Sequence, residues 1–120
     1  MKDPISGNVP TVEEYQAAIG TAWENSKSKP ELIFEAHFQA PRHALTHKQL
    51  GESVGHRSSR SIYWRFAARV LKALNREKGR EHWIDILVIK DDAEGMINGE
   101  YRLVLRPEVV QAIRNLGLLP

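Results

Sequence analysis

Cysteine is absent from this chain of 120 residues. Disulfide bonds, thiolate zinc sites and cysteine nucleophiles are therefore excluded, which is compatible with a reducing cytoplasm. Long apolar runs are lacking too, because no stretch approaches the ~20 apolar residues that span a bilayer, and the first residues lack the apolar run of a signal peptide. We expect a soluble, cytoplasmic protein with no membrane partner.

Signatures of catalysis are also missing. The chain has no nucleophile elbow, no phosphate-binding loop and no acid pair in an identifiable apolar pocket. Ser58, Ser59 and Ser61 near His56 could be imagined as nucleophiles and base, but helix capping explains the serines better. We expect no enzyme activity and no cofactor.

The five histidines do not form a convincing metal site. His43 and His47 stand four residues apart, but Thr46 is expected to cap a helix between them, so they would not share a helical face. No cysteine or well-placed carboxylate completes a tetrahedral ligand set. We therefore expect no bound metal.

Charge, by contrast, is concentrated in one segment. Residues 42–80 hold ten of the seventeen Lys and Arg but only two of the fifteen Asp and Glu, a formal charge of +8, whereas the rest of the chain carries −6. A local excess of this size is typical of a surface that meets phosphate groups. The segment predicts a nucleic-acid binder.

Capping residues and prolines predict two helices in the first third of the chain. Thr11 and Glu14 form a capping box before apolar residues at helical spacing, which predicts a helix from there to about Asn25. Pro30 suits the first turn of a second helix over residues 32–40, which Pro41 should end. Residues 1–10 are expected to be a flexible lead-in, and residues 11–120 a single domain.

Two further helices are predicted in the basic segment. Thr46 precedes a short helical pattern over residues 47–53, which Gly55 is placed to stop. After a tight turn, Ser58 or Ser59 can cap a longer helix from about Arg60 to Lys78, with Gly79 as its end.

The longer helix has an apolar face and a basic face. At 100° per residue, one side collects Tyr63, Phe66, Ala67, Val70 and Leu74, and the other collects Arg65, Arg69, Lys72 and Arg76. Tyr63 is expected in the core. For Trp64, at the margin of the apolar face, we favour a core or interface role over stacking on a base.

Beyond Gly79 the pattern changes to strands. Residues 83–89 are apolar on both faces and residues 101–105 alternate, so the two segments should pair as a hairpin. The turn signal at residues 98–99 leaves two alternatives open, one long loop or an extra short rung near residues 96 and 97. Pro107 should start a closing helix that Gly117 ends.

This order predicts a mainly helical α+β fold, a winged helix-turn-helix with a C-terminal β-hairpin wing and a closing helix. The second helix of the turn pair would enter the major groove. Residues expected near base edges are Arg57, Ser58, Ser59, Arg60, Ser61, Trp64 and Arg65. Residues expected at phosphates are Arg42, Lys48, Arg69, Lys72 and Arg76.

The run from Ala40 to Gly55 (APRHALTHKQLGESVG), with the following helix that ends in VLKAL, resembles the winged-helix modules of bacterial HNH-type, modification-dependent restriction endonucleases and related standalone proteins. Residues 83–105 and 106–110 are similar to them in layout. The resemblance implies binding of double-stranded DNA, sensing of modified cytosine, and targeting of a nuclease or regulator to DNA. His56 stands where family members often have an aromatic residue. No HNH pattern is present, so nuclease activity is not implied.

Acidic residues in the expected wing favour an alternative. Asp91, Asp92, Glu94 and Glu100 gather in the loop that approaches the DNA backbone in many winged helices, where phosphates would repel them. Their spacing lacks the alternating ligands of a calcium loop. Either the wing points away from DNA, or the loop 91–94 docks on a basic protein partner. The competing hypothesis is therefore a protein-interaction module that uses the basic helix or this acidic loop.

Overall fold

The structure is a computed structural model and describes residues 5, 7–25, 31–53, 55, 60–76, 84–91 and 101–119. Its helices are α1 (Val12–Glu24), α2 (Glu31–Gln39), α3 (His47–Ser53), α4 (Arg60–Ala73) and α5 (Pro107–Leu116), with a 3-10 turn η1 (Pro41–His43). Its strands are β1 (Ala44–Leu45), β2 (Val88–Asp91) and β3 (Arg102–Leu105). The expected mainly helical α+β class is confirmed.

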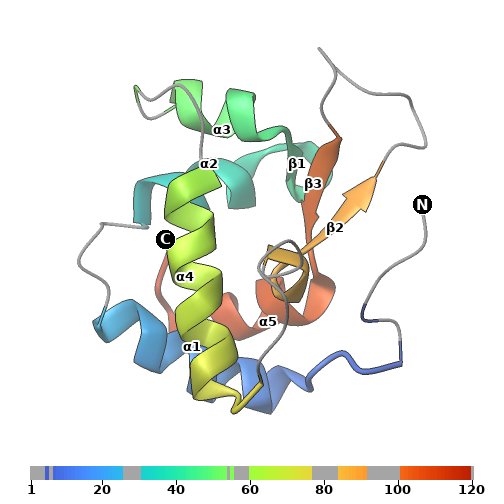
Figure 1. The fold of residues 1–120 in the computed structure, drawn as a ribbon. Helices are drawn as coiled ribbons and strands as arrows, with labels where there is room; N and C mark the ends of the chain where they lie inside the picture. The colour runs from blue at the N-terminus through green and yellow to red at the C-terminus, as the bar shows by residue number, and fades with distance from the viewer. Residues whose placement is uncertain are drawn as a thin grey trace.

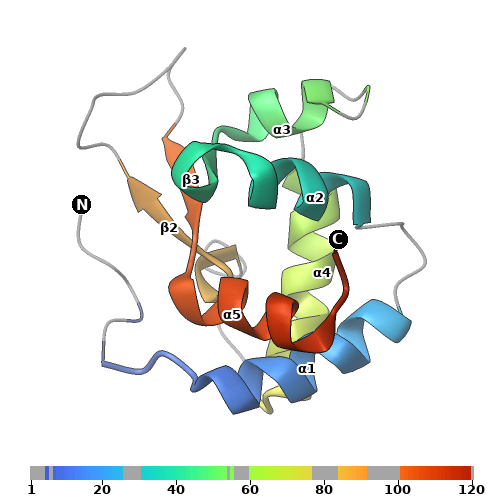
Figure 2. The same cartoon turned by 180° about the vertical axis from the view of Figure 1, so that it is seen from behind.

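A small sheet stands at one side of the helices. In Figures 1 and 2, α1 and α5 lie together at one end of the molecule, α2 and α3 lie at the other end, and α4 runs between the two ends. β2 and β3 stand on the side away from α4. None of the helices in the described part of the chain has the length and apolar character needed to cross a membrane.

Capping boxes start two of the helices. The box formed by Thr11 and Glu14 was predicted, and a second box starts at Thr46, the predicted cap of α3. The Thr11 hydroxyl accepts a hydrogen bond from the Glu14 N–H (3.1 Å), and the Glu14 carboxylate accepts one from the Thr11 N–H (3.0 Å). Thr46 and Gln49 repeat this reciprocal pair at the start of α3, at 3.1 and 3.0 Å. Each pair satisfies two backbone donors that a helix start leaves without an internal partner.

The end predicted for α4 is wrong, because the helix stops five residues before Lys78. Asn75 adopts a left-handed backbone conformation with a φ of 58°. The Arg76 N–H then donates to the Leu71 carbonyl at 2.8 Å, a Schellman-type closure that satisfies a terminal carbonyl. Gly79, the predicted stop, lies outside the described residues.

Asn75 provides a direct test of this helix end. Its N–H also donates to the Lys72 carbonyl at 3.0 Å, so the turn requires the left-handed conformation. Asn75→Ala should lower the free energy of unfolding by about 1 kcal/mol, because a Cβ without a compensating amide is costly at positive φ. Asn75→Gly should leave it unchanged or raise it by a few tenths. Urea denaturation measures both, and an alanine variant as stable as the glycine variant would contradict the assignment.

The sheet has three antiparallel strands in the order β1-β3-β2. The predicted hairpin pairing is confirmed, with Val88 opposite Leu105 and Asp91 opposite Arg102. The sequence pattern did not reveal β1, which pairs with the other edge of β3 through Leu45 and Leu103. The predicted rung near residues 96 and 97 lies outside the described residues.

The predicted strand over residues 83–89 is partly wrong. Residues 84–86 form a 3-10 turn, and β2 begins only at Val88. The Leu87 N–H donates to the Ile84 carbonyl at 2.9 Å, which closes this turn. Residues 84–88 are all at most 3 % exposed. A run that is apolar on both faces is compatible with a buried turn as well as with a buried strand, so the pattern alone does not distinguish the two.

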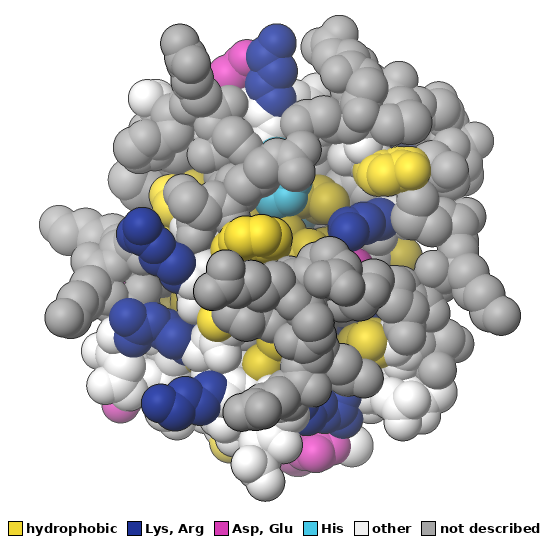
Figure 3. Space-filling view, viewed as in Figure 1, with side chains coloured by type: hydrophobic (Ala, Val, Ile, Leu, Met, Phe, Trp, Pro, Cys, Tyr) yellow, Lys and Arg dark blue, Asp and Glu magenta, His cyan; other side chains and the backbone are white. Residues whose placement is uncertain are grey.

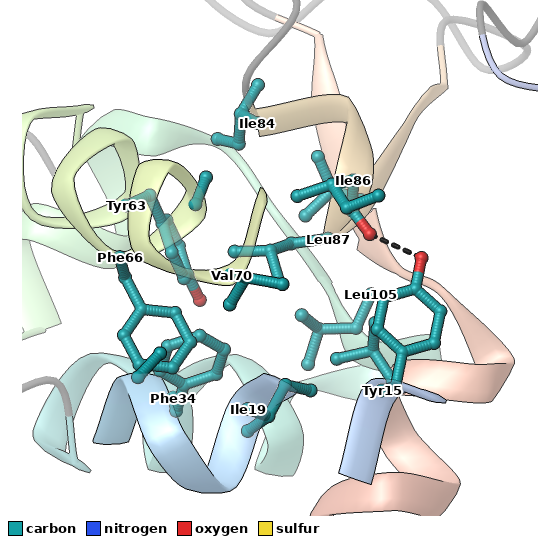
Figure 4. Close-up of a cluster of buried hydrophobic side chains, with 14 of the residues drawn as sticks. Tyr15, Ile19, Phe34, Tyr63, Phe66, Val70, Ile84, Ile86, Leu87 and Leu105 are labelled. Carbon is teal, nitrogen blue, oxygen red and sulfur yellow. Dashed lines mark hydrogen bonds between the residues drawn. The ribbon is translucent and has the colours of Figure 1, made fainter. Parts of the chain in front are cut away.

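The core lies where α1, α2, α4, α5, β3 and the buried turn meet, and Figure 4 shows part of it. Phe34 is its aromatic centre, with ring centroids 5.0 Å from Tyr63 and 4.9 Å from Phe66. The Tyr15 hydroxyl donates to the Ile86 carbonyl at 2.6 Å, so α1 also supplies a partner for the backbone of the buried turn.

Residues 1–10 were expected to be a flexible lead-in. Within the described part of that segment, Ile5 is only 5 % exposed and belongs to the core. The Asn8 N–H donates to its carbonyl at 2.8 Å, and Val9 packs against the core. This stretch therefore packs against the helical body.

Candidate nucleic-acid interface

The site is built on the two faces of α4. Its inner face is in the core, as predicted, with Tyr63, Phe66, Ala67 and Val70 each at most 1 % exposed. Among its described side chains, Trp64, Arg65, Lys72 and Ala73 are exposed on the outer face. The helix sequence RSIYWRFAARVLKA contains no Asp or Glu. Lys and Arg side chains follow α4 on the face shown in Figure 3.

Trp64 is not a core residue. It is 42 % exposed, so of the two roles favoured from the sequence the core role is wrong. Its neighbour Tyr63 occupies the core position instead and is fully buried. The helical period explains this result, because a step of 100° carries the chain from the centre of the apolar face to its edge.

Two of the predicted phosphate contacts also serve the fold. Both Arg69 and Arg76 are half-buried. The Arg69 guanidinium donates to the Asn25 carbonyl at the end of α1, and the Arg76 guanidinium donates to the Asn8 carbonyl at 2.6 Å. These bonds tie α4 to segments before and after α1. Of the predicted cations in α4 whose side chains the structure describes, Arg65 and Lys72 are therefore the exposed ones.

The remaining predicted phosphate contacts lie near the start of α3. Arg42 and Lys48 are both exposed. Arg42 has a φ of 56° and His43 a φ of 54°, so η1 holds two consecutive side chains in a conformation that L-residues rarely adopt. The His47 ring, 6.4 Å from that of Tyr63, places the start of α3 beside the first turns of α4.

The predicted base-proximal set is only partly placed. Arg57, Ser58 and Ser59 lie outside the described residues. The backbones of Arg60 and Ser61 form the first turn of α4, but their side chains lie outside the description. Trp64 and Arg65 stand about one turn further along the helix, both exposed.

A buried histidine that was not predicted from the sequence holds α4 in place. His37 on α2 is fully buried and lies 2.6 Å through Nε2 from the Leu103 carbonyl on β3 and 2.7 Å through Nδ1 from the Tyr63 hydroxyl on α4. A carbonyl only accepts hydrogen bonds, so Nε2 carries the proton and Nδ1 accepts from Tyr63. Its position after Ile33 and Phe34 on the apolar face is the signal that could have revealed it.

Burial sets the protonation of this pair. It lowers the pKa of His37 to about 4, although the bond to the Leu103 carbonyl opposes that shift. Burial also raises the pKa of the Tyr63 hydroxyl above its ordinary value. At neutral pH both groups are uncharged, and the single tautomer of His37 links α2, α4 and β3.

Basic residues on the sheet side have structural partners. Arg106 is 2 % exposed, and its Nε donates to the Asp85 carbonyl at 2.8 Å. The Lys90 ammonium lies 3.8 Å from the buried Asp85 carboxylate. These cations therefore balance the polar groups of the buried turn.

Of the predicted acidic loop, residues 91–94, the structure describes only Asp91. Asp91 is half-buried at the end of β2 and lies opposite Arg102 in the sheet. A cross-strand neighbour of opposite charge reduces the repulsion that Asp91 would exert on phosphate. Residues 92–94, the rest of the predicted partner-binding loop, lie outside the described residues.

Comparisons with protein-family models, curated proteins and solved structures find no match.

Within the described residues, no group of three or more His, Cys, Asp or Glu side chains is placed to hold a metal ion. The properties of the interface therefore follow from the geometry and charge of this chain.

Proposed function

We propose that the chain is a winged helix-turn-helix module that binds duplex DNA with α4 in the major groove. The element order from α2 to β3 supports the fold assignment: the helix α2, the short strand β1, the two successive helices α3 and α4, and the strands β2 and β3 that complete an antiparallel sheet with β1. In that arrangement α3 and α4 are the turn pair, and β2 and β3 are the wing. The second helix of such a pair is the one that reads DNA.

The charge of α4 is the observation that carries the proposal. Arg65 and Lys72 point outward from a helix of fourteen residues that contains no acid to neutralise them. Arg69 lies four residues after Arg65 and three before Lys72, and like charges at those spacings repel one another. Cations that only solubilise a helix are usually interleaved with acids at i+3 or i+4. A bound phosphate backbone would relieve that repulsion and release counterions.

The positions along α4 suggest a division of roles. Trp64 and Arg65 lie in the first half of the helix, where a recognition helix meets base edges. Lys72 lies two turns further along, and Arg42 and Lys48 precede or begin α3, where contacts to phosphates would fix the orientation. The first group would supply specificity and the second would supply affinity.

A salt series tests the proposal. The purified protein is titrated with a mixed-sequence duplex, plain and cytosine-methylated, at several salt concentrations. Three to five phosphate contacts predict a slope of about −3 to −4.5 for log K against log salt. Absence of binding at low salt would contradict the proposal. The methylated duplex separately tests the sensing of modified cytosine that the resemblance implies, and with it a role in directing a nuclease or regulator to DNA.

The alternative is a protein-interaction module, and the exposure of Trp64 favours it. Tryptophan and arginine are enriched at the energetic centres of protein interfaces, and here Trp64 and Arg65 are adjacent. In that case the salt series shows no DNA binding. If the acidic loop makes the contact, Asp91→Lys with Asp92→Lys should abolish association, as measured by sedimentation, and leave any DNA affinity intact.

A further inference from the structure

Trp64 does not belong to the buried core. Trp23, Phe34, Tyr63 and Phe66 already form a continuous aromatic cluster, with ring centroids between 4.9 and 5.9 Å apart for the contacting pairs. Trp64 is the large hydrophobic side chain that the described part of the protein leaves exposed, at 42 %. When a partner covers exposed indole surface, the burial stabilises the complex by roughly 25 cal/mol per Å². Its position therefore points to a ligand.

The neighbours of Trp64 restrict what that ligand can be. Around the helix axis, Ala68 lies about 40° from Trp64 and about 60° from Arg65, one turn further along. The outer face thus has an aromatic side chain on one margin, a cation on the other, and a small side chain between them. An anionic surface with an apolar group close to its charges fits this face, and a purely apolar partner surface does not, because it would bury the Arg65 charge.

Duplex DNA offers one such apolar group. In the major groove the base pairs present hydrogen-bond donors and acceptors, and the C5-methyl group of thymine is the apolar exception. Resting on the proposed function, we propose that Trp64 recognises thymine by packing its indole against this methyl group in the major groove. Trp64 then determines specificity for a T·A pair, while Arg65 contacts a neighbouring base edge or phosphate.

Uracil makes the test specific, because deoxyuridine differs from thymidine only by the missing methyl group. A preferred duplex is first selected from a random pool with the wild-type protein. Each thymine in it is then replaced singly by uracil, and the Kd is measured for the wild type, for Trp64→Ala and for Arg65→Gln. At one or two positions the wild type should bind the uracil duplex about threefold to tenfold more weakly.

The variants separate the two roles on this face. Trp64→Ala should bind the thymine and uracil duplexes equally well at those positions. Arg65→Gln is the matched control: it should bind both more weakly and keep the wild-type ratio between them. The two substitutions form double-mutant cycles with the DNA change, which cancel any general effect of uracil on the duplex.

Several results would overturn the inference. A wild-type protein that discriminates at no thymine, or a Trp64→Ala variant that keeps the full discrimination, removes Trp64 from base recognition while leaving DNA binding in place. A protein that binds no duplex at low salt overturns the proposed function as well. The two failures are therefore distinguishable.

Discussion

Arg65→Glu combined with Lys72→Glu should weaken binding to duplex DNA at least about 100-fold at roughly 0.1 M salt. In the proposed complex, each substitution removes a cation from the DNA-facing side of α4 and adds a charge that the phosphates repel. Both side chains are exposed, so the free energy of unfolding should change by no more than about 0.5 kcal/mol. Fluorescence anisotropy measures the affinity, and thermal denaturation verifies the fold.

Substitutions that neutralise one cation at a time count the contacts to DNA phosphates. Arg65→Gln and Lys72→Gln should each reduce the steepness of the salt dependence by about 0.9 if the side chain meets a phosphate. Arg114→Gln on α5 is the matched control, because Arg114 is exposed and lies 5.2 Å from the Phe38 ring, on a helix that packs against α1. It should not alter the slope. A folded double-glutamate variant with wild-type affinity would exclude α4 as the DNA surface.

Arg69 and Arg76 are poor choices for this test even though the sequence places them on the same face. Their guanidinium groups donate to the carbonyls of Asn25 and Asn8. Glutamate at either position would break a contact within the protein, so a loss of affinity would have two causes. Arg65 and Lys72 separate DNA binding from folding.

Acidification from pH 7 to pH 5 should cost the protein about 2 kcal/mol of unfolding free energy through His37 alone. Burial lowers the pKa of His37 to about 4 from an ordinary value of 6.5. The unfolded chain therefore takes up a proton first as the pH falls. The contribution of the neutral, hydrogen-bonded histidine is fully present above pH 6.5 and is lost between pH 6.5 and 4, about 3 kcal/mol in all.

His37→Gln is the control that keeps the hydrogen bonds and removes the titration. A glutamine amide can donate to the Leu103 carbonyl, and its oxygen can accept from the Tyr63 hydroxyl, as the imidazole does. Urea denaturation of both proteins at pH 7, 6 and 5 should show that the stability of the variant falls less. Parallel curves would mean that His37 is not held neutral in the folded protein.

The sequence alone determined the local features of this fold. Thr11 with Glu14, Pro41, Pro107 and Gly117 mark helix boundaries that the structure confirms within a residue or so. These signals act between residues a few positions apart, so the chain carries them regardless of what packs around it. The faces of α4 follow likewise from the 3.6-residue period.

The tertiary structure decided which long-range partner each group takes. β1 exists as a strand only because β3 lies beside it, and residues 84–86 form a turn whose carbonyl at Ile86 meets the Tyr15 hydroxyl. The sequence placed Arg65, Arg69, Lys72 and Arg76 in one basic row. Only packing revealed that Asn25 and Asn8 supply acceptors for two of them.

His37 shows the same limit from inside the core. Its apolar neighbours in the sequence indicate a buried helix face, but the partners of its two nitrogens come from α4 and β3. Hydrogen bonding and desolvation depend on which groups meet across the fold, and that information is distributed over the whole chain. Composition and periodicity therefore located the basic surface, while tertiary contacts determined which of its side chains are available to a ligand.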